Sequence, residues 1–351
     1  MQDIRNTLRS PADLVGAALA PPDRLAALAE VAAHYAVAIT PAVAALIDPA
    51  AAGDPIGRQF VPDARELVAR PEEMADPIGD HPHSPVAGIV HRYPDRVLLK
   101  LTHICAAYCR FCFRRETVGR PAESMLSRRA LAEALAYIAD HAEIWEVILS
   151  GGDPLVLSDR RLREVARRLA AVDHVKVVRL HTRVPVVEPG RITPALVRAL
   201  KTSGKATYVV LHANHARELT PAARAACARL IDAGLPMLSQ SVLLRGVNDD
   251  AQTLGDLMRA FVECRIKPYY LHHADLAPGT AHFRTSIEDG QRIMRGLRGN
   301  YSGLCQPTYV LDIPGGHGKS PIGPSYLAET GQPGRYLVED FRGARHVYPL
   351  A

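Results

Sequence analysis

The chain has 351 residues, with 42 Lys and Arg against 37 Asp and Glu, so its formal charge is +5. This mild excess comes without a concentrated basic face or interleaved aromatic and basic residues, so it gives no sign of a nucleic-acid partner. A hydrophobic content of 48 % and a charged content of 23 % exclude a disordered chain and predict a globular protein with a large core.

The N-terminal part reads as short helices broken by proline, followed by a loop rich in Asp, Pro, His and Gly over residues 76–84. Its Ala-rich stretch from Leu25 to Ala52 is the one candidate for a membrane span. Glu30, His34 and Pro41 interrupt it well short of about 20 apolar residues. The first residues hold no apolar signal-peptide core either. We therefore expect a helical cap in a cytoplasmic protein with no membrane partner.

From residue 96 onward, short apolar runs rich in β-formers alternate with amphipathic helical patterns. The apolar runs cover residues 96–104, 145–152, 175–182, 206–214, 236–246, 267–275 and 307–313, and the helical patterns cover residues 127–141, 159–171, 193–202, 221–233, 251–264 and 287–298. Strands that alternate with helices predict a parallel sheet with right-handed crossovers.

The predicted fold is α/β, a partial (β/α)6-type TIM barrel with an N-terminal helical region, and an open doubly wound sheet is the alternative. We expect an N-terminal helical cap over residues 1–85, the barrel over residues 86–300, and a C-terminal segment with a tail over residues 301–351. In either architecture the functional edge lies where the parallel strands end. The unusual residues of the chain collect at these strand ends.

Three of the six cysteines, Cys105, Cys109 and Cys112, fall within eight residues after the first predicted strand, and the others are scattered like small buried hydrophobes. Structural zinc sites usually combine two separated cysteine pairs, and no second pair is present. Three thiolates suit an iron–sulfur cluster that leaves one iron open. With Phe111 before the last cysteine, this spacing resembles the radical S-adenosylmethionine (SAM) superfamily, whose open iron binds SAM.

Two further segments follow predicted strands. In LSGGDPL, Gly151 and Gly152 allow a ligand to approach the backbone, although a plain Gly-Gly turn is the alternative. In DIPGGHGKSP, Lys319 is one of only six lysines, and it suits a Schiff base with an aldehyde cofactor such as pyridoxal 5'-phosphate (PLP). A phosphate-binding P-loop would need glycine where Ile313 stands, so a surface loop is the remaining alternative.

From about residue 38 to residue 324 the chain resembles one family, the lysine 2,3-aminomutases. The matching segments are, in order, ITPAVAALIDP, DPIGDHPHSPVAGIVHRYPDRVLL, CxxxCxxCFRR, ILSGGDPL, RITPALV, SQSVLLRGVND, KPYYLHHADLAPGTAHFR and PTYVLDIPGGHGKSP. The resemblance implies radical SAM chemistry with PLP. It also implies a short form of the family, because no cysteine follows Cys305 and Asp250 stands where longer members carry a partner cysteine for a C-terminal zinc site.

The resemblance implies the following roles for single residues. Cys105, Cys109 and Cys112 hold a [4Fe-4S] cluster, Lys319 forms the internal aldimine with PLP, Arg92 and Arg96 contact the PLP phosphate, Ser150, Gly151, Gly152 and Asp153 hold the amino group of SAM, and His212 and Gln240 line the SAM pocket. Arg114 binds the substrate carboxylate, and Asp275 and Asp312 clasp the terminal ammonium of the substrate. A planar guanidinium suits a carboxylate, and two acids select a cation.

The implied reaction moves the α-amino group of L-lysine to the β-carbon. One electron, from a donor such as flavodoxin or ferredoxin, leads to cleavage of SAM, and the resulting radical removes a hydrogen from the β-carbon. The amino group then migrates as an imine of PLP. Without the zinc site we expect at most a homodimer.

Three alternatives stay open. The same chemistry could supply β-lysine for elongation factor P, although that branch typically lacks the acid at Asp312. The substrate could be another basic amino acid such as arginine. A non-catalytic metal-binding scaffold is the alternative outside enzymology.

Overall fold

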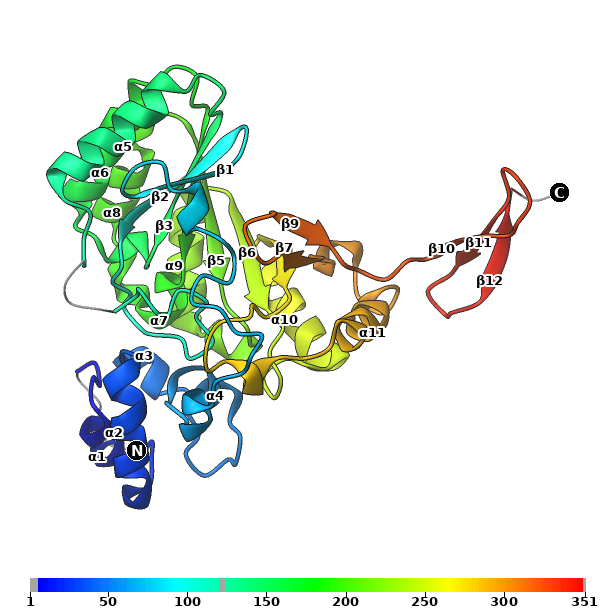
Figure 1. Ribbon diagram of the computed structural model, residues 1–351, viewed down its shortest axis with the longest axis horizontal. Coiled ribbons are helices and arrows are strands. Elements are labelled where there is room, and N and C mark those ends of the chain that lie inside the picture. The colour runs from blue at the N-terminus through cyan, green and yellow to red at the C-terminus, as the bar shows by residue number, and fades with distance from the viewer. Residues whose placement is uncertain (1–5, 120–123, 350–351) are drawn as a thin grey trace.

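A computed structural model of the chain describes residues 6–119 and 124–349, so the extreme ends of the expected first and last segments lie outside the described residues. Its main feature is a nine-stranded sheet in which the strands follow one another in chain order (Figure 1). The strands are β1 (Ile89–Tyr93), β2 (Arg96–Thr102), β3 (Glu146–Gly151), β4 (Val177–Thr182), β5 (Ala206–His212), β6 (Met237–Val242), β7 (Ile266–His272), β8 (Thr308–Asp312) and β9 (Lys319–Pro321).

Strands β2 to β8 run parallel to their neighbours, while β1 and β9 pair antiparallel at the two edges. The helices that connect the parallel strands are α5 (Arg128–Asp140), α6 (Asp159–Ala170), α8 (Pro194–Leu200), α9 (Pro221–Asp232), α10 (Ala251–Glu263) and α11 (Ile287–Leu297). The predicted α/β class is therefore confirmed. The sheet is mixed and curled, and within the described residues its edge strands do not pair with each other. A plain (β/α)6 description omits those two antiparallel edges.

The six connecting helices begin where the sequence places a capping side chain. The residues before them are Ser127, Ser158, Thr193, Thr220, Asp250 and Ser286, and each accepts a hydrogen bond from a backbone N–H in the first turn. Asp250, which departs from the longer family pattern, has this structural role through a 2.8 Å bond from Thr253 N.

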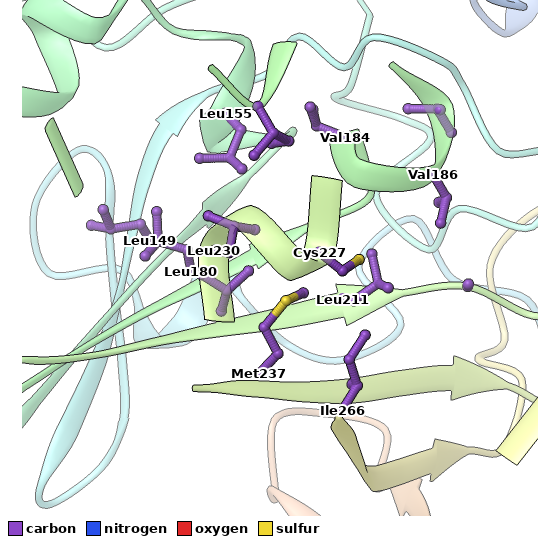
Figure 2. Close-up of a cluster of buried hydrophobic side chains, with 14 of the residues drawn as sticks. Leu149, Leu155, Leu180, Val184, Val186, Leu211, Cys227, Leu230, Met237 and Ile266 are labelled. Carbon is purple, nitrogen blue, oxygen red and sulfur yellow. The ribbon is translucent and has the colours of Figure 1, made fainter. Parts of the chain in front are cut away.

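The core lies between the sheet and these helices. Figure 2 shows Leu149 and Leu180 of the sheet near Cys227 and Leu230 of α9. Every residue of β3 is buried, as expected of a parallel strand covered on both faces. The three scattered cysteines, Cys227, Cys264 and Cys305, are buried in this core, which confirms their interpretation as small hydrophobes.

The N-terminal region consists of short helices, as expected: α1 (Pro11–Gly16), α2 (Leu25–His34), α3 (Pro41–Ala44) and α4 (Pro55–Phe60). Helix α3 packs against the short helix α7 (Val184–Val187), which follows β4. Thr40 also donates a 2.5 Å hydrogen bond to the carbonyl of Val187. The N-terminal helices therefore lie at the carboxyl end of the parallel strands.

The C-terminal segment holds a second sheet that the sequence analysis did not predict. Strands β10 (Leu327–Glu329), β11 (Tyr336–Glu339) and β12 (Arg345–Tyr348) form an antiparallel arm that extends away from the main body (Figure 1). Its short strands are largely exposed, so they lack the buried apolar runs that identified the main sheet. No helix in residues 6–119 and 124–349 is long and apolar enough to cross a membrane.

Candidate active site

A cavity of about 550 Å³ lies inside the curled sheet and opens among the loops that follow its strands. Every site residue expected from the sequence lines it: Arg92, Arg96, Cys105, Cys109, Cys112, Arg114, Ser150, Gly151, Gly152, Asp153, His212, Gln240, Asp275, Asp312 and Lys319. Residues between Ile78 and Lys319, far apart in the sequence, thus line one cavity.

The three cysteines lie on the loop after β2, and a buried ion triad holds this loop in place. Arg110 donates to Glu66 from Nε at 3.0 Å and from Nη2 at 2.6 Å, and Arg115 Nη2 binds the same carboxylate. All three side chains are almost fully buried. The Arg110 backbone N–H also donates to the carbonyl of Gln59 at 2.8 Å. The N-terminal region therefore determines the shape of the cysteine loop.

Burial raises the pKa of all three thiols, that of Cys112 to about 11. Without a metal these thiols stay protonated at neutral pH, and metal binding would release their protons. Across the described ranges, no three His, Cys, Asp or Glu side chains surround a single ion position. A [4Fe-4S] cluster distributes its thiolates over different iron atoms. Three thiols on one buried loop are a suitable donor set for it.

Close packing on the end of β2 and the cysteine loop requires the two glycines at the end of β3. A Cβ on Gly151, whose φ is +109°, would lie 2.4 Å from the carbonyl oxygen of Thr102. A Cβ on Gly152 would lie 2.3 Å from that of Ile104. The sequence suggested room for a ligand at these glycines, and the structure adds a packing reason for them.

Asp153 joins the ends of β3 and β4. Its buried carboxylate accepts hydrogen bonds from Leu155 N at 3.0 Å, Thr182 Oγ1 at 2.8 Å and Arg183 N at 2.7 Å. Burial raises the pKa of this carboxyl group. Asp153 therefore lines the cavity with its carboxylate already engaged by the protein.

Lys319 begins β9 and stands opposite Asp312 of β8 in the antiparallel register. Its Nζ lies 2.5 Å from Asp312 Oδ1, and its backbone N–H donates to the Tyr93 hydroxyl at 2.7 Å. The other oxygen of Asp312 lies 3.2 Å from His272 Nδ1. Burial alone would raise the pKa of Asp312, but the hydrogen bond from His272 and the charge of Lys319 lower it well below its usual range.

Asp275 differs from Asp312 in its charge state. It lines the cavity without a hydrogen bond or ion pair to the described residues, and burial together with the charge of Asp312 raises its pKa to about 8. At neutral pH the site alone therefore holds one ionised and one protonated acid. A cationic ligand would favour ionisation of both.

Two arginines of the cavity share a buried acid that the sequence analysis missed. Arg92 Nη2 lies 3.2 Å from Asp80 Oδ1 and 2.6 Å from the carbonyl of Ile78, and Arg114 Nε lies 2.8 Å from Asp80 Oδ2. Asp80 lies in the loop of residues 76–84, where an acid among Pro, His and Gly carries no distinctive signal. Its role is visible only in space.

The same region has groups free to receive an anion such as the PLP phosphate. Arg92 Nε is buried without a partner among the described atoms. Arg96 pairs with Asp95 at 2.6 Å and stacks on the Tyr93 ring at 3.8 Å. Because the Tyr93 hydroxyl binds the backbone of Lys319, Arg96 lies near the lysine. This arrangement suits PLP, whose phosphate needs cations and whose aldehyde needs an amine.

Histidines form another wall of the cavity. His212 of β5 is the register partner of Gln240 of β6, and its ring lies 5.7 Å from Phe111. His181 of β4 also lines the cavity but was not predicted, because a histidine inside an apolar strand reads as a core residue. Both have a buried Nε2 without a partner in the described part of the chain, and burial keeps both neutral by lowering their pKa. They can therefore donate to or accept from a bound ligand.

Comparison with known proteins identifies the family of the chain. Residues 99–258 match the Radical SAM superfamily profile, and residues 294–350 match the profile described as Lysine-2,3-aminomutase. The L-lysine 2,3-aminomutase of Clostridium subterminale is 42 % identical over 89 % of this chain and 74 % of its own. That of Escherichia coli strain K12 is 41 % identical over 77 % and 78 %. The glutamate 2,3-aminomutase of Clostridioides difficile is 39 % identical over 86 % and 71 %.

Proposed function

Because the chain belongs to the lysine 2,3-aminomutase family of radical SAM enzymes, we propose that it converts L-lysine to β-lysine by moving the α-amino group to the β-carbon. The enzyme is an isomerase, and its cofactors are a [4Fe-4S] cluster, SAM and PLP. The observation that carries the proposal is the single cavity lined by the three thiols, Lys319 and two acids.

The choice of lysine over glutamate follows from charge. Asp275 and Asp312 both line the cavity, Asp312 ionised and Asp275 protonated at neutral pH. A cationic ligand favours loss of the Asp275 proton, so that both acids can bind it. A glutamate side chain would instead face two acids, and like charges in a buried site repel strongly. Arginine satisfies the same charge requirement and is the natural competitor in the test below.

When bound, the cluster and SAM supply reductive radical chemistry, and PLP supplies an aldehyde with a conjugated ring. The protein supplies position. We propose that Cys105, Cys109 and Cys112 hold the cluster and that Ser150, Gly151, Gly152, Asp153, His212 and Gln240 border SAM. Lys319 would hold PLP, with Arg92 and Arg96 on its phosphate.

The substrate would be held at both ends. Arg114 donates a hydrogen bond from Nε to Asp80. The two terminal nitrogens of Arg114 are then left to bind the α-carboxylate of the substrate. Asp312 forms an ion pair with Lys319 Nζ. With Lys319 engaged by PLP, the ε-ammonium of the substrate would take the place of the Lys319 amine beside the same carboxylate. The buried walls exclude water from the reaction.

We further propose that the reaction takes place in the cytoplasm with a one-electron donor of the flavodoxin or ferredoxin class. The assembly would be at most a homodimer, which light scattering of the cofactor-loaded protein would test.

The deciding experiment is anaerobic reconstitution with iron, sulfide and PLP, followed by incubation with single amino acids, SAM and a reductant. L-lysine should yield β-lysine, and separation of the products by chirality would give their stereochemistry. Lys319→Ala should retain the cluster absorbance but lose the PLP band and the product. A protein that cleaves SAM yet leaves every basic amino acid unchanged, or that converts glutamate, would refute the proposal.

A further inference from the structure

Arg183 is a buried cation in contact with the cysteine loop, and neither the sequence analysis nor the proposed function gives it a role. It follows β4 directly, lines the cavity and is 7 % exposed. Its Nη1 lies 2.7 Å from Cys109 Sγ. The guanidinium also packs against the rings of Phe60 at 4.6 Å and Phe111 at 5.5 Å.

The direction of this guanidinium is determined by its other terminal nitrogen. Arg183 Nη2 lies 2.6 Å from Glu218 Oε2 and 2.5 Å from Gln59 Oε1. The charge of Glu218 compensates that of Arg183, and both side chains are buried, where an unpaired charge would be very costly.

Glu218 is itself held by the backbone. Its Oε1 accepts hydrogen bonds from Asn214 N at 2.8 Å and His215 N at 3.0 Å, in the turn after β5. Because the planar fork of Arg183 is anchored through Nη2, its Nη1 is left pointing at the Cys109 sulfur. This is the second-layer arrangement that commonly tunes a metal ligand.

We infer that Arg183 is a positioning residue that donates a charged hydrogen bond to the Cys109 thiolate and thereby raises the reduction potential of the bound cluster. The inference rests on the proposed function, in which Cys109 is a cluster ligand. Reduction adds one electron from the one-electron donor to the cluster and neither forms nor breaks a bond to the protein. A hydrogen bond and a positive charge at the sulfur stabilise the more negative reduced state.

The chain offers a matched control on β4, the strand that precedes Arg183. Arg179 forms a buried pair with Glu146 at 2.8 Å, and both residues line the same cavity. Within the described residues Arg179 has no hydrogen bond to a cysteine. Removal of either pair deletes one buried positive and one buried negative charge, and only one of the two pairs contacts the cysteine loop.

The test compares the double variant R183M/E218Q with the control R179M/E146Q, so that neither leaves an unpaired buried charge. Each protein is reconstituted anaerobically, its iron and sulfide are quantified, and the cluster is titrated without SAM by electron paramagnetic resonance at defined potentials. We expect R183M/E218Q to bind the cluster with a midpoint potential shifted to more negative values. The control should keep the wild-type potential.

An unchanged potential in a fully loaded R183M/E218Q, or an equal shift in the control, would overturn the inference. So would a variant whose potential is unchanged while its affinity for SAM falls, because Arg183 would then bind SAM instead. If R183M/E218Q assembles no cluster, R183K is titrated, since an ammonium cannot span Glu218 and Cys109 as the fork does. R183K should still show a negative shift, caused by loss of the hydrogen bond alone because the positive charge remains, and an unchanged potential would overturn the inference. Failure of the wild-type protein to assemble any cluster would refute the proposed function instead.

Discussion

Asp312 and Lys319 face each other across the antiparallel pair β8–β9, with the lysine nitrogen 2.5 Å from a carboxylate oxygen. The acid proposed to bind the substrate ammonium therefore already binds an ammonium of the protein. The proposed cofactor and substrate sites are adjacent because one strand pair carries both residues. The lysine and the substrate would use this carboxylate in turn.

Asp312→Asn should raise the KM for L-lysine by about 10- to 150-fold, since a hydrogen bond to a charged group contributes about 1.5–3 kcal/mol. Steady-state kinetics of the reconstituted enzyme would measure it. Asp140→Asn, at the exposed end of α5, is the control and should leave KM unchanged. Equal KM values for the two variants would contradict the ammonium-binding role of Asp312.

The pKa of Asp275 near 8 predicts a pH-dependent affinity for lysine. Below this pKa the carboxyl is protonated and must release a proton to bind the ε-ammonium, whose own pKa is about 10.4. The KM for lysine should therefore fall as pH rises, by about tenfold per pH unit below the pKa, and level off above it. Asp275→Asn should have a higher KM without this slope. The same slope in both proteins would assign the titration to another group.

Asp80→Asn should weaken the binding of both PLP and L-lysine. The buried Asp80 carboxylate faces Arg92, Arg114 and Lys100. We expect PLP affinity, measured by absorbance titration, to fall more than about tenfold as two arginines lose a charged partner. Asp232→Asn, in an exposed pair with Arg265, is the control. Normal PLP and lysine binding by Asp80→Asn would show that the arginines are held by other contacts.

Glu66→Gln should loosen the cysteine loop by leaving Arg110 and Arg115 without their shared carboxylate. Breaking a buried ion pair costs about 3–5 kcal/mol, so the melting temperature and the iron content after reconstitution should both fall. Glu72→Gln removes an acid whose side chain is 52 % exposed and serves as the control. If Glu66→Gln has a reduced melting temperature but its full iron content, Glu66 stabilises the fold without being needed for cluster assembly. That result would refute its role in supporting the cysteine loop.

Gly152→Ala should displace the cysteine loop, because the new methyl group would lie 2.3 Å from the carbonyl oxygen of Ile104. Gly190→Ala adds the same methyl group where nothing lies within 4 Å and should be neutral. Iron content and the melting temperature are the measurements. Wild-type values for Gly152→Ala would mean that the loop can shift without losing its three thiols.

The sequence alone was sufficient to predict strands β2 to β8 and the six connecting helices. Hydrophobic periodicity and capping residues, from which such elements are predicted, are local properties of the chain. It also predicted the thiol trio, Lys319 and the acids that line the cavity, because their motifs are short and their strand-end positions direct them to one edge. The arm of β10 to β12 escaped prediction because its exposed strands bury too little apolar surface to leave a periodic pattern.

Only the tertiary structure revealed the residues that hold the site in place. Glu66 and Glu218 lie in single-turn 3-10 helices and Asp80 lies in a loop. Each of the three acids meets an arginine at least 12 positions away in the chain, which no local pattern shows. A buried charge acquires its role from the opposite charge that folding brings to it. Sequence pattern therefore predicted which groups would perform the chemistry, and three-dimensional charge pairing decided how those groups are positioned.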